Sequence, residues 1–280
     1  RIAVIGGAGS ASASVLDAAV YNPAGLAETV RNAVSVSANL YGIQKYRASS
    51  FLYPGEDLVT DNLVSIPSTM GAVFRLWDGC AVAISAFVPD RLVTSQIQGF
   101  ETGQHNYALA IEDQTMWLGP SVGFRITPTL SAGASVFGLY RTYSMTESLF
   151  WGDYMLSYSR SIRADNLGFV GLVGLGYRPL EDVSIGITVQ SPSLNAGGSG
   201  NFKTDLVLGA SGYEGAAGSY ATDLDTENRL PPKIVLGVSW EKPRQWALAA
   251  DISHHLATTF NTLEGTDNWG NPLTTEFRRE

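Results

Sequence analysis

Apolar and polar residues alternate one by one along much of this chain. From Val34 to Leu40 the apolar residues hold the even positions, and from Val183 to Gln190 they hold the odd ones. A period of two residues is typical of a β-strand with one apolar and one polar face. The pattern predicts about nine strands, over residues 34–40, 66–76, 80–88, 116–126, 130–141, 167–177, 183–190, 233–240 and 246–254.

The connections between these strands are of two kinds, which alternate strictly along the chain. Four are tight and carry Gly, Pro or Asp, the usual residues of turns: Trp77 to Gly79, Thr127 to Thr129, Arg178 to Asp182 and Glu241 to Gln245. The others, near 47–65, 89–115, 142–166 and 191–232, run to tens of residues. This alternation is typical of a membrane barrel with short periplasmic turns and long external loops. We therefore predict an all-β, transmembrane antiparallel β-barrel with the tight turns at one end.

The alternation also predicts which way each strand faces. Val34, Val36, Ala38 and Leu40 are expected to face lipid, and Ser35, Ser37 and Asn39 the lumen. Nine strands are an odd number, whereas bacterial single-chain barrels usually have an even number and leave no edge in lipid. The tail from Asn261 to Glu280 reads as a loop, so we expect the barrel to be incomplete at the C-terminus of this chain. The start at Arg1, with no initiator Met or signal peptide, looks processed or truncated.

Composition narrows the class of protein further. Charged residues make up 16% of the 280 residues, against about 25% in soluble domains, and glycine and tyrosine are abundant. A net charge of −8 argues against a nucleic-acid partner. The single cysteine, Cys80, excludes an internal disulfide framework and a multi-cysteine metal site.

The first thirty residues differ from the rest and carry the sharpest motif. Small residues, Gly6 to Ala11, precede Asn22-Pro23-Ala24, and the first strand follows near Val34. This arrangement resembles the N-terminal hatch of the FadL-type family of outer-membrane transporters for long-chain fatty acids, toluene and related hydrocarbons. Ser65-Ile66-Pro67 and Leu230-Pro231-Pro232 resemble later landmarks of the family, so the similarity spans nearly the whole chain.

The resemblance implies a fourteen-stranded barrel in Gram-negative outer membrane, with residues 1–32 as the hatch and 33–280 as barrel. It implies passive uptake of hydrophobic small molecules, an internal pocket, and lateral escape of ligand through a defect in the third strand. It implies no catalysis and no cofactor. The expected surroundings are outer-membrane lipid and lipopolysaccharide, and the long connections are candidate sites for a protein partner. The connection at 142–166 is shorter than the family's long helical loop, which puts the external capture site in doubt.

Three groups of residues are candidates for function. Pro23 fixes its backbone and withholds a donor while Asn22 supplies polar bonds, so Asn22-Pro23-Ala24 is expected to hold the hatch in the lumen; an ordinary turn is the alternative. Pro89 ends the third strand, so Ala86, Phe87, Val88 and Pro89 mark either a lateral opening or a simple strand end. Phe137, Leu139 and Arg141 share the inward parity. They are candidate ligand contacts, Arg141 pairing either with a ligand carboxylate or with a carboxylate of the hatch or wall.

Other chemistries are less consistent with the sequence. Gly7 to Ser12 imitates a dinucleotide fingerprint, but its third glycine is replaced by Ser12 and no strand–helix alternation follows. His254 and His255 are adjacent in a strand and face opposite sides, so we expect no metal site. Aromatic residues near strand ends are candidates for the membrane interface, with core packing as the alternative: Trp117, Phe150, Trp151, Tyr154, Tyr158, Trp240 and Trp246. A barrel with a closed lumen that docks a partner is the alternative to transport.

Overall fold

A computed structural model describes residues 9–11, 15–36, 41–49, 57–65, 69–100, 105–152, 155–210, 213–242 and 245–279. A short helical segment precedes the strands and consists of η2 (Val15–Asp17), α1 (Ala18–Tyr21) and η3 (Pro23–Glu28). The strands are β1 (Ala33–Val36), β2 (Tyr41–Ala48), β3 (Leu58–Ser65), β4 (Thr69–Trp77), β5 (Cys80–Phe100), β6 (His105–Arg125), β7 (Leu130–Trp151), β8 (Leu156–Leu180), β9 (Val183–Gln190), β10 (Leu194–Ala210), β11 (Tyr213–Thr226), β12 (Lys233–Lys242), β13 (Trp246–His255), β14 (Thr258–Thr266) and β15 (Pro272–Arg279). None of the helices in the described residues is long and apolar enough to cross a membrane.

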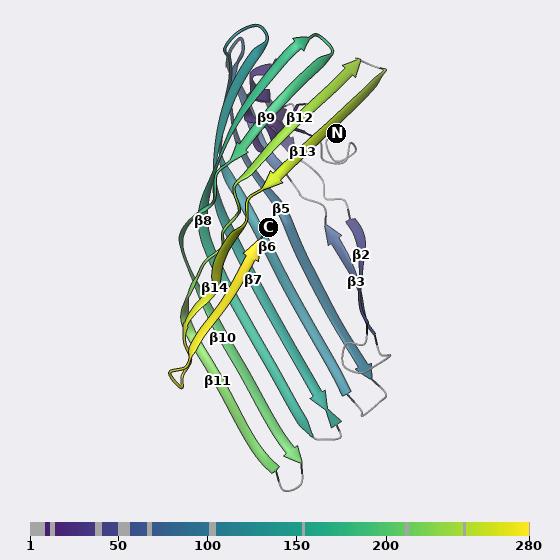
Figure 1. The fold of residues 1–280 in the computed structure, drawn as a ribbon, viewed down its shortest axis with the longest axis vertical. Coiled ribbons are helices and arrows are strands. Elements are labelled where there is room, and N and C mark those ends of the chain that lie inside the picture. The colour runs from purple at the N-terminus through teal and green to yellow at the C-terminus, as the bar shows by residue number, and fades with distance from the viewer. Residues whose placement is uncertain are drawn as a thin grey trace.

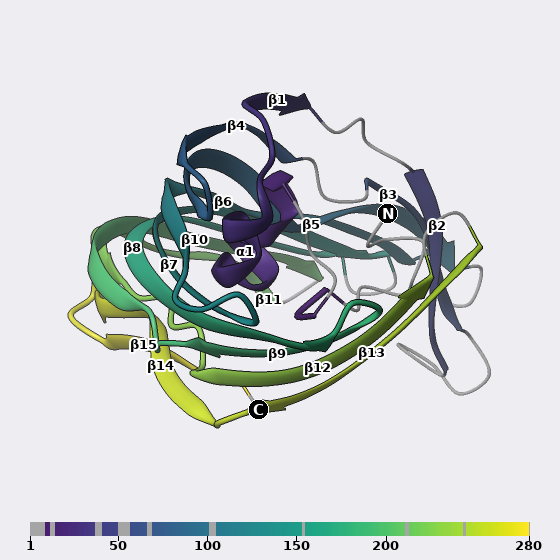
Figure 2. The ribbon, with the colours of Figure 1, turned by 90° about the horizontal axis from the view of Figure 1, so that it is seen from above.

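Thirteen of the strands form one antiparallel sheet, which curls into a trough (Figures 1 and 2). The order runs from β1 through β4, β5, β6 and β7 to β8, where the sheet divides into two sectors. One half of β8, Leu172 to Leu180, pairs with β9, which continues to β12 and β13. The other half, Leu156 to Phe169, pairs with β10, which continues to β11, β14 and β15. The strands β2 and β3 pair with each other in a separate sheet.

Each of the nine predicted strands overlaps an observed one, but the prediction of long loops is wrong. Most of the residues in the four long connections belong to strands. Those near 89–115 and 142–166 extend β5 to β8 to 21 to 25 residues each, and those near 47–65 and 191–232 form the additional strands β2, β3, β10 and β11. These extensions carry polar residues on both faces, as in Asp90 to Gln98, and therefore lack the alternation that revealed the other halves. The count of about nine strands was too low for the same reason.

The prediction of a loop-like tail from Asn261 to Glu280 is also wrong, because residues 258–279 form the hairpin of β14 and β15. Its turn is organised by Asp267, whose carboxylate accepts hydrogen bonds from the amides of Trp269 and Asn271 at 2.9 and 2.8 Å. Short, mixed strands around a polar turn give little period-two signal, which explains why the sequence pattern failed here.

The prediction that the tight turns gather at one end is confirmed. The amide of Arg125 donates to the carbonyl of Gly79 at 2.7 Å, and that of Arg178 to Thr129 at 2.8 Å. The amide of Glu241 donates to Asp182 at 2.8 Å, which brings the turn after β12 to the same rim. Pro243 itself lies outside the described residues. The hairpins of the extended strands lie at the opposite end (Figure 1).

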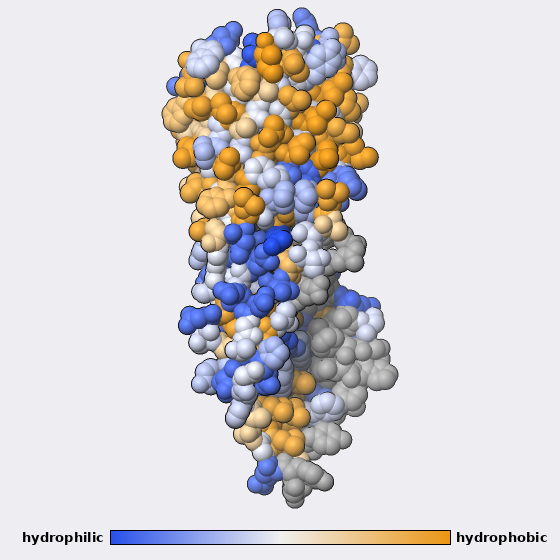
Figure 3. Space-filling model, turned by 60° about the vertical axis from the view of Figure 1, so that its left-hand side comes forward, coloured by the Kyte–Doolittle hydropathy of each residue, from blue (hydrophilic) through white to orange (hydrophobic). Residues whose placement is uncertain are grey.

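The outer face of the trough carries an apolar band next to the tight turns (Figure 3). On β8 the outward residues from Leu167 to Tyr177 include Phe169, Val173 and Leu175, all exposed, whereas Arg163 and Asp165 stand just beyond. Eleven residues of a strand tilted by about 45° span roughly 25 Å, the height of the apolar band of an outer-membrane barrel.

The first strand faces as predicted where it is described. Val34 and Val36 are outward, with 81% and 77% of their surfaces exposed. Ser37, Ala38, Asn39 and Leu40 lie outside the described residues, as do Ile66 and Pro67 of the second predicted strand.

The aromatic residues near strand ends separate into two groups. Trp240 and Trp246 are exposed close to the tight turns, and their rings meet edge to face at 4.6 Å, as expected of an interfacial girdle. Trp117 follows the alternative of core packing, because it is buried and faces inward. Its parity along β6, opposite to that of the exposed Met116 and Leu118, accounts for the difference. Tyr154 lies outside the described residues.

Candidate functional site

The helical segment lies on the concave face of the sheet, inside the trough (Figure 2). Asn22, which is buried, joins this segment to the wall. Its side-chain nitrogen donates to the carbonyls of Ser10 at 2.7 Å and Leu175 at 3.0 Å, and its oxygen accepts from the amide of Ala24 at 3.1 Å. Both donors are therefore used, and the oxygen caps the first turn of η3. Pro23 and Ala24 are fully enclosed beside it.

Glycines on the inner face of the wall allow this segment to approach the backbone of the sheet. A Cβ added at Gly133 would stand 2.3 Å from the carbonyl carbon of Pro23, and one at Gly174 would stand 2.0 Å from the side-chain oxygen of Asn22. A Cβ at Gly186 would stand 1.8 Å from the carbonyl oxygen of Ser10. Any side chain at these positions would push the segment away, so the glycines that interrupt the polar face of the predicted strands are contact points for it.

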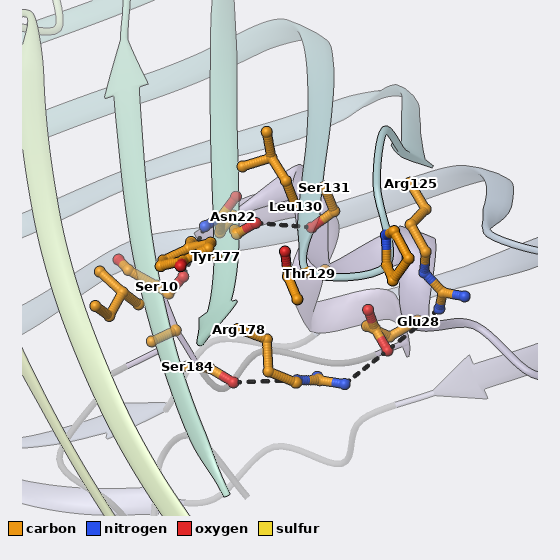
Figure 4. A pocket seen from close by; sticks show the side chains of 15 residues that line it. Ser10, Asn22, Glu28, Arg125, Thr129, Leu130, Ser131, Tyr177, Arg178 and Ser184 are labelled. Carbon is orange, nitrogen blue, oxygen red and sulfur yellow. Dashed lines mark hydrogen bonds and ion pairs between the residues drawn. The ribbon is translucent and has the colours of Figure 1, made fainter. Parts of the chain in front are cut away.

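Polar bonds anchor the two ends of the segment. Near the tight turns, the Glu28 carboxylate pairs with Arg178 at 3.1 Å and Arg125 at 3.5 Å (Figure 4). At the other end, the Asp251 carboxylate of β13 accepts from the amides of Gly9 and Ser10 at 2.9 and 3.0 Å. The segment therefore bridges strands that are far apart in the sheet.

A cavity of about 550 Å³ lies between the helical segment and the wall. The segment contributes Val20 and Tyr21 to its lining, and the wall contributes Phe87, Trp117 and Leu172. Pocket volumes of this order suit small organic ligands. The rest of the lining is Ser10, Asp17, Thr69, Pro89, Thr188, Gln190, Leu230, Pro231, Lys233, Val235, Asp251, Ser253 and His255.

An aromatic cluster forms one side of this cavity. The rings of Phe87 and Trp117 lie 5.0 Å apart, and Phe137 meets them at 5.4 and 5.8 Å. Leu139 packs in the same buried cluster, as do Val170 and Leu172. The structure thus brings together Phe137, Leu139 and Phe87, which the sequence assigned to separate roles. Phe137 and Leu139 support the wall of the cavity from behind, whereas Phe87 lines it.

The third strand in the order of the main sheet, β5, is irregular at the residues for which the sequence predicted a lateral opening. Its ladder with β6 pairs Phe87 with Trp117 and then Asp90 with Thr115, so Val88 and Pro89 together oppose one residue and form a β-bulge. The ladder with β4 ends at Thr69 and Phe87. Pro89 lines the cavity at this level, while Ala86 still pairs with Met70 and Leu118.

Arg141 is directed inward but is engaged with the wall. Its guanidinium makes a two-pronged contact with the Asp113 carboxylate at 2.8 and 2.7 Å, with only 8% of the residue exposed. This arrangement is the strong geometry of an arginine–carboxylate pair. Of the two partners expected from the sequence, the structure therefore shows the wall carboxylate. Arg141 is absent from the cavity lining.

Several residues of the cavity were not singled out in the sequence. Trp117 was a candidate for either the membrane interface or the core, and Leu172, Thr188, Lys233 and His255 had no assigned role as ligand contacts. Their inward parity was readable from the alternation, but which inward residues meet depends on how the sheet curls. Among the described residues, no group of three or more His, Cys, Asp or Glu side chains is arranged to hold a metal ion.

The chain matches the family model described as outer membrane protein transport protein (OMPP1/FadL/TodX) over residues 5–277. It therefore belongs to this family, which consists of transport channels of the Gram-negative outer membrane rather than enzymes. No curated protein matches the chain.

Solved structures show the same fold at low sequence identity. The toluene transporter TodX of P. putida superimposes with a TM-score of 0.67 at 16% identity, over 90% of this chain and 68% of that one. The Ralstonia pickettii toluene transporter TbuX gives a TM-score of 0.67 at 15% identity, over 99% of this chain and 78% of that one. A TodX variant, the deltaS2S3 mutant monoaromatic hydrocarbon channel, gives 0.73 at 16% identity, over 96% and 73%. The trough is thus transmembrane β-barrel wall, and the protein transports hydrophobic compounds across the outer membrane.

Proposed function

We propose that the protein admits small apolar, ring-containing molecules through the cavity between the helical segment and the aromatic wall. The observation that carries this proposal is the position of that cavity, which is bounded by Val20 and Tyr21 on one side and by Phe87 and Trp117 on the other. Tilted and edge-to-face aromatic contacts at 5.0 to 5.8 Å suit an additional ring. Arg141 is held by Asp113, so the proposal does not include it among the ligand contacts.

We further propose that residues 1–32 act as a hatch. Asn22, Pro23 and Ala24 fill the lumen between the cavity and the tight-turn rim, so a ligand in the cavity has no straight path to the periplasm. The bulge at Val88 and Pro89 offers a sideways exit at the level of the apolar band, and movement of the helical segment would connect the cavity to this exit. An apolar molecule that leaves there never re-enters water, which favours this route. The apolar band would be surrounded by outer-membrane lipid and lipopolysaccharide.

Binding of an aromatic probe tests the cavity. Trp117→Ala should weaken toluene binding and slow toluene uptake by about tenfold, because it removes one face of the cavity. Leu118→Ala is the matched control, since Leu118 is the outward neighbour of Trp117 on the side away from the bulge. Equal effects of the two variants would contradict the proposal.

The hatch has its own test. Asn22→Ala removes the bonds to Ser10 and Leu175 and should mainly slow hydrophobic uptake. Deletion of residues 1–24 should in addition let small polar solutes leak through. If the deletion changes neither solute flux nor toluene uptake, the hatch role is wrong and a partner-docking barrel becomes the better explanation.

A further inference from the structure

Lys233, the first residue of β12, is a cationic residue in the lining of the cavity. It lines the cavity together with Phe87 and Trp117. Register pairs it with Gln190 of β9 on one side and His255 of β13 on the other, so all three side chains enter the lumen in one row. The sheet curls between β6 and β12, so these two strands lie on opposite sides of the trough (Figure 2).

Lys233 lies within the membrane-spanning part of the wall. The next residues on the outer face of β12 are the exposed apolar Ile234, Leu236 and Val238. Ionisable residues at this depth are costly unless they face a cavity and meet a partner. Lys233 meets the first condition, since its side chain is only partly exposed and is directed inward.

In the part of the chain that the structure describes, no carboxylate forms an ion pair with Lys233. The two acids in the same lining are placed differently: Asp251 accepts the amides of Gly9 and Ser10, and Asp17 belongs to the helical segment. The neighbouring Gln190 amide donates to the carbonyl of Pro231 at 3.3 Å. By contrast, Arg141, Arg125 and Arg178 all have carboxylate partners. Lys233 therefore differs from these three arginines.

We propose that Lys233 binds the anionic group of amphipathic ligands, so that the cavity accepts aromatic carboxylates as well as uncharged hydrocarbons. The ring would lie against Phe87 and Trp117, and the carboxylate would accept hydrogen bonds from the Lys233 ammonium, with His255 beside it. Charge-assisted bonds of this type in a site of low dielectric are strong. Removal of the ligand carboxylate from water is thereby offset by an ammonium that is already desolvated in part. This inference rests on the proposed ligand cavity.

The test compares two probes on the same ethylbenzene frame, 4-ethylbenzoate with a carboxylate and 4-ethyltoluene with an uncharged methyl group in its place. Their affinities for the full chain in detergent micelles are measured by displacement of the uncharged fluorophore N-phenyl-1-naphthylamine. Lys233→Met should lower the affinity for 4-ethylbenzoate about tenfold and leave 4-ethyltoluene unchanged. Lys233→Arg should restore most of the carboxylate affinity. Lys242→Met, at the tight-turn end of the same strand, should have no effect on either probe.

The outcomes distinguish this inference from the proposed function. If 4-ethyltoluene binds normally but Lys233→Met leaves 4-ethylbenzoate unaffected, the carboxylate site is wrong and the cavity stands. If Lys233→Met weakens both probes equally, Lys233 shapes the cavity without recognising charge, which also overturns the inference. If neither probe displaces the fluorophore from the unaltered protein, the cavity itself is not a ligand site and the proposed function fails.

Discussion

The two halves of β8 show how one strand serves two surroundings. Between Leu167 and Tyr177 its outer face is apolar and exposed. On its inner face, Gly174 and Gly176 lie against the helical segment, and Val170 and Leu172 belong to the buried aromatic cluster. Between Leu156 and Asp165 the outer face is polar, with Arg163 and Asp165 exposed. The strand geometry is the same throughout. The residues on the two faces change along the strand. The half from Leu167 to Tyr177 therefore has the character of membrane-spanning wall, and the half from Leu156 to Asp165 that of a continuation beyond the membrane.

The inner faces of the two halves differ as well. Beyond the apolar band the inner face of the wall carries polar pairs between the neighbouring strands β6 and β7, such as Arg141 with Asp113 and Tyr107 with Glu147. Burial, followed by the hydrogen bond to Glu147, raises the pKa of Tyr107 above its ordinary range, so this hydroxyl stays a donor. Next to the tight turns, glycine contacts and backbone bonds take the place of such pairs. The outer half thus holds its shape by side-chain pairing, and the membrane half by close packing against the hatch segment.

The largest expected effect comes from placing a charge on the outer face of each half. Leu175→Arg should destabilise the protein by about 2–4 kcal/mol if Leu175 lies near the midplane of the bilayer. Ser157→Arg, on the same strand and also exposed, should change stability by less than about 0.5 kcal/mol. Unfolding in urea from lipid vesicles measures both. Equal costs would mean that the apolar band has been placed wrongly.

A second comparison uses two glycines of β7. Gly133→Val should clash with Pro23 and destabilise the protein by about 1–3 kcal/mol, and it should raise polar solute leakage. Gly138→Val adds a side chain where a Cβ meets nothing closer than 3.7 Å, and should be nearly neutral. The measurement is polar solute flux into liposomes that contain each variant. Leakage through both variants, or through neither, would contradict the claim that the hatch packs against Gly133.

The ion pair of the outer half should matter less. Asp113→Asn leaves Arg141 without its charged partner and should cost about 1–2 kcal/mol, because the pair is only partly buried. The double variant Arg141→Met with Asp113→Leu should recover most of this loss. Toluene uptake should be unchanged in both, and a marked fall in the double variant would show that Arg141 acts on the ligand after all.

The smallest change in stability is expected at the bulge of β5. Deleting Pro89 lets Val88 alone oppose Met116 and keeps the facing of Asp90 to Phe100, since the register shift is one residue. Toluene binding in micelles should persist, whereas uptake into cells should fall. Pro89→Ala keeps the bulge and is the control; uptake that survives the deletion would exclude this exit.

The sequence predicts the features of the fold and the site that depend on local alternation, and it does not predict those that depend on contacts between distant residues. The alternation located the membrane halves of the strands, the tight-turn rim and the inward parity of Phe137, Leu139 and Arg141. It missed β10, β11 and the β14–β15 hairpin, since a strand that is polar on both faces has no period-two signal. The partner of Arg141 was left open because Asp113 and Arg141 meet only through the pairing of β6 with β7. Trp117 and Lys233 line the same cavity only because the whole sheet curls, and no local sequence pattern predicts that curvature.

The central claim, that the helical segment must move for uptake, can be tested by fastening it to the wall. A Cβ at Gly176 would lie 3.6 Å from the Cβ of Ala24, a separation that suits a disulfide. The variant Ala24→Cys with Gly176→Cys is made in a Cys80→Ala background, because Cys80 is free and buried. Toluene uptake is measured in cells under oxidising conditions and again after reduction, with each single cysteine variant as a control. We predict that the oxidised double variant loses uptake and that reduction restores it. Full uptake while the disulfide is intact would contradict the claim.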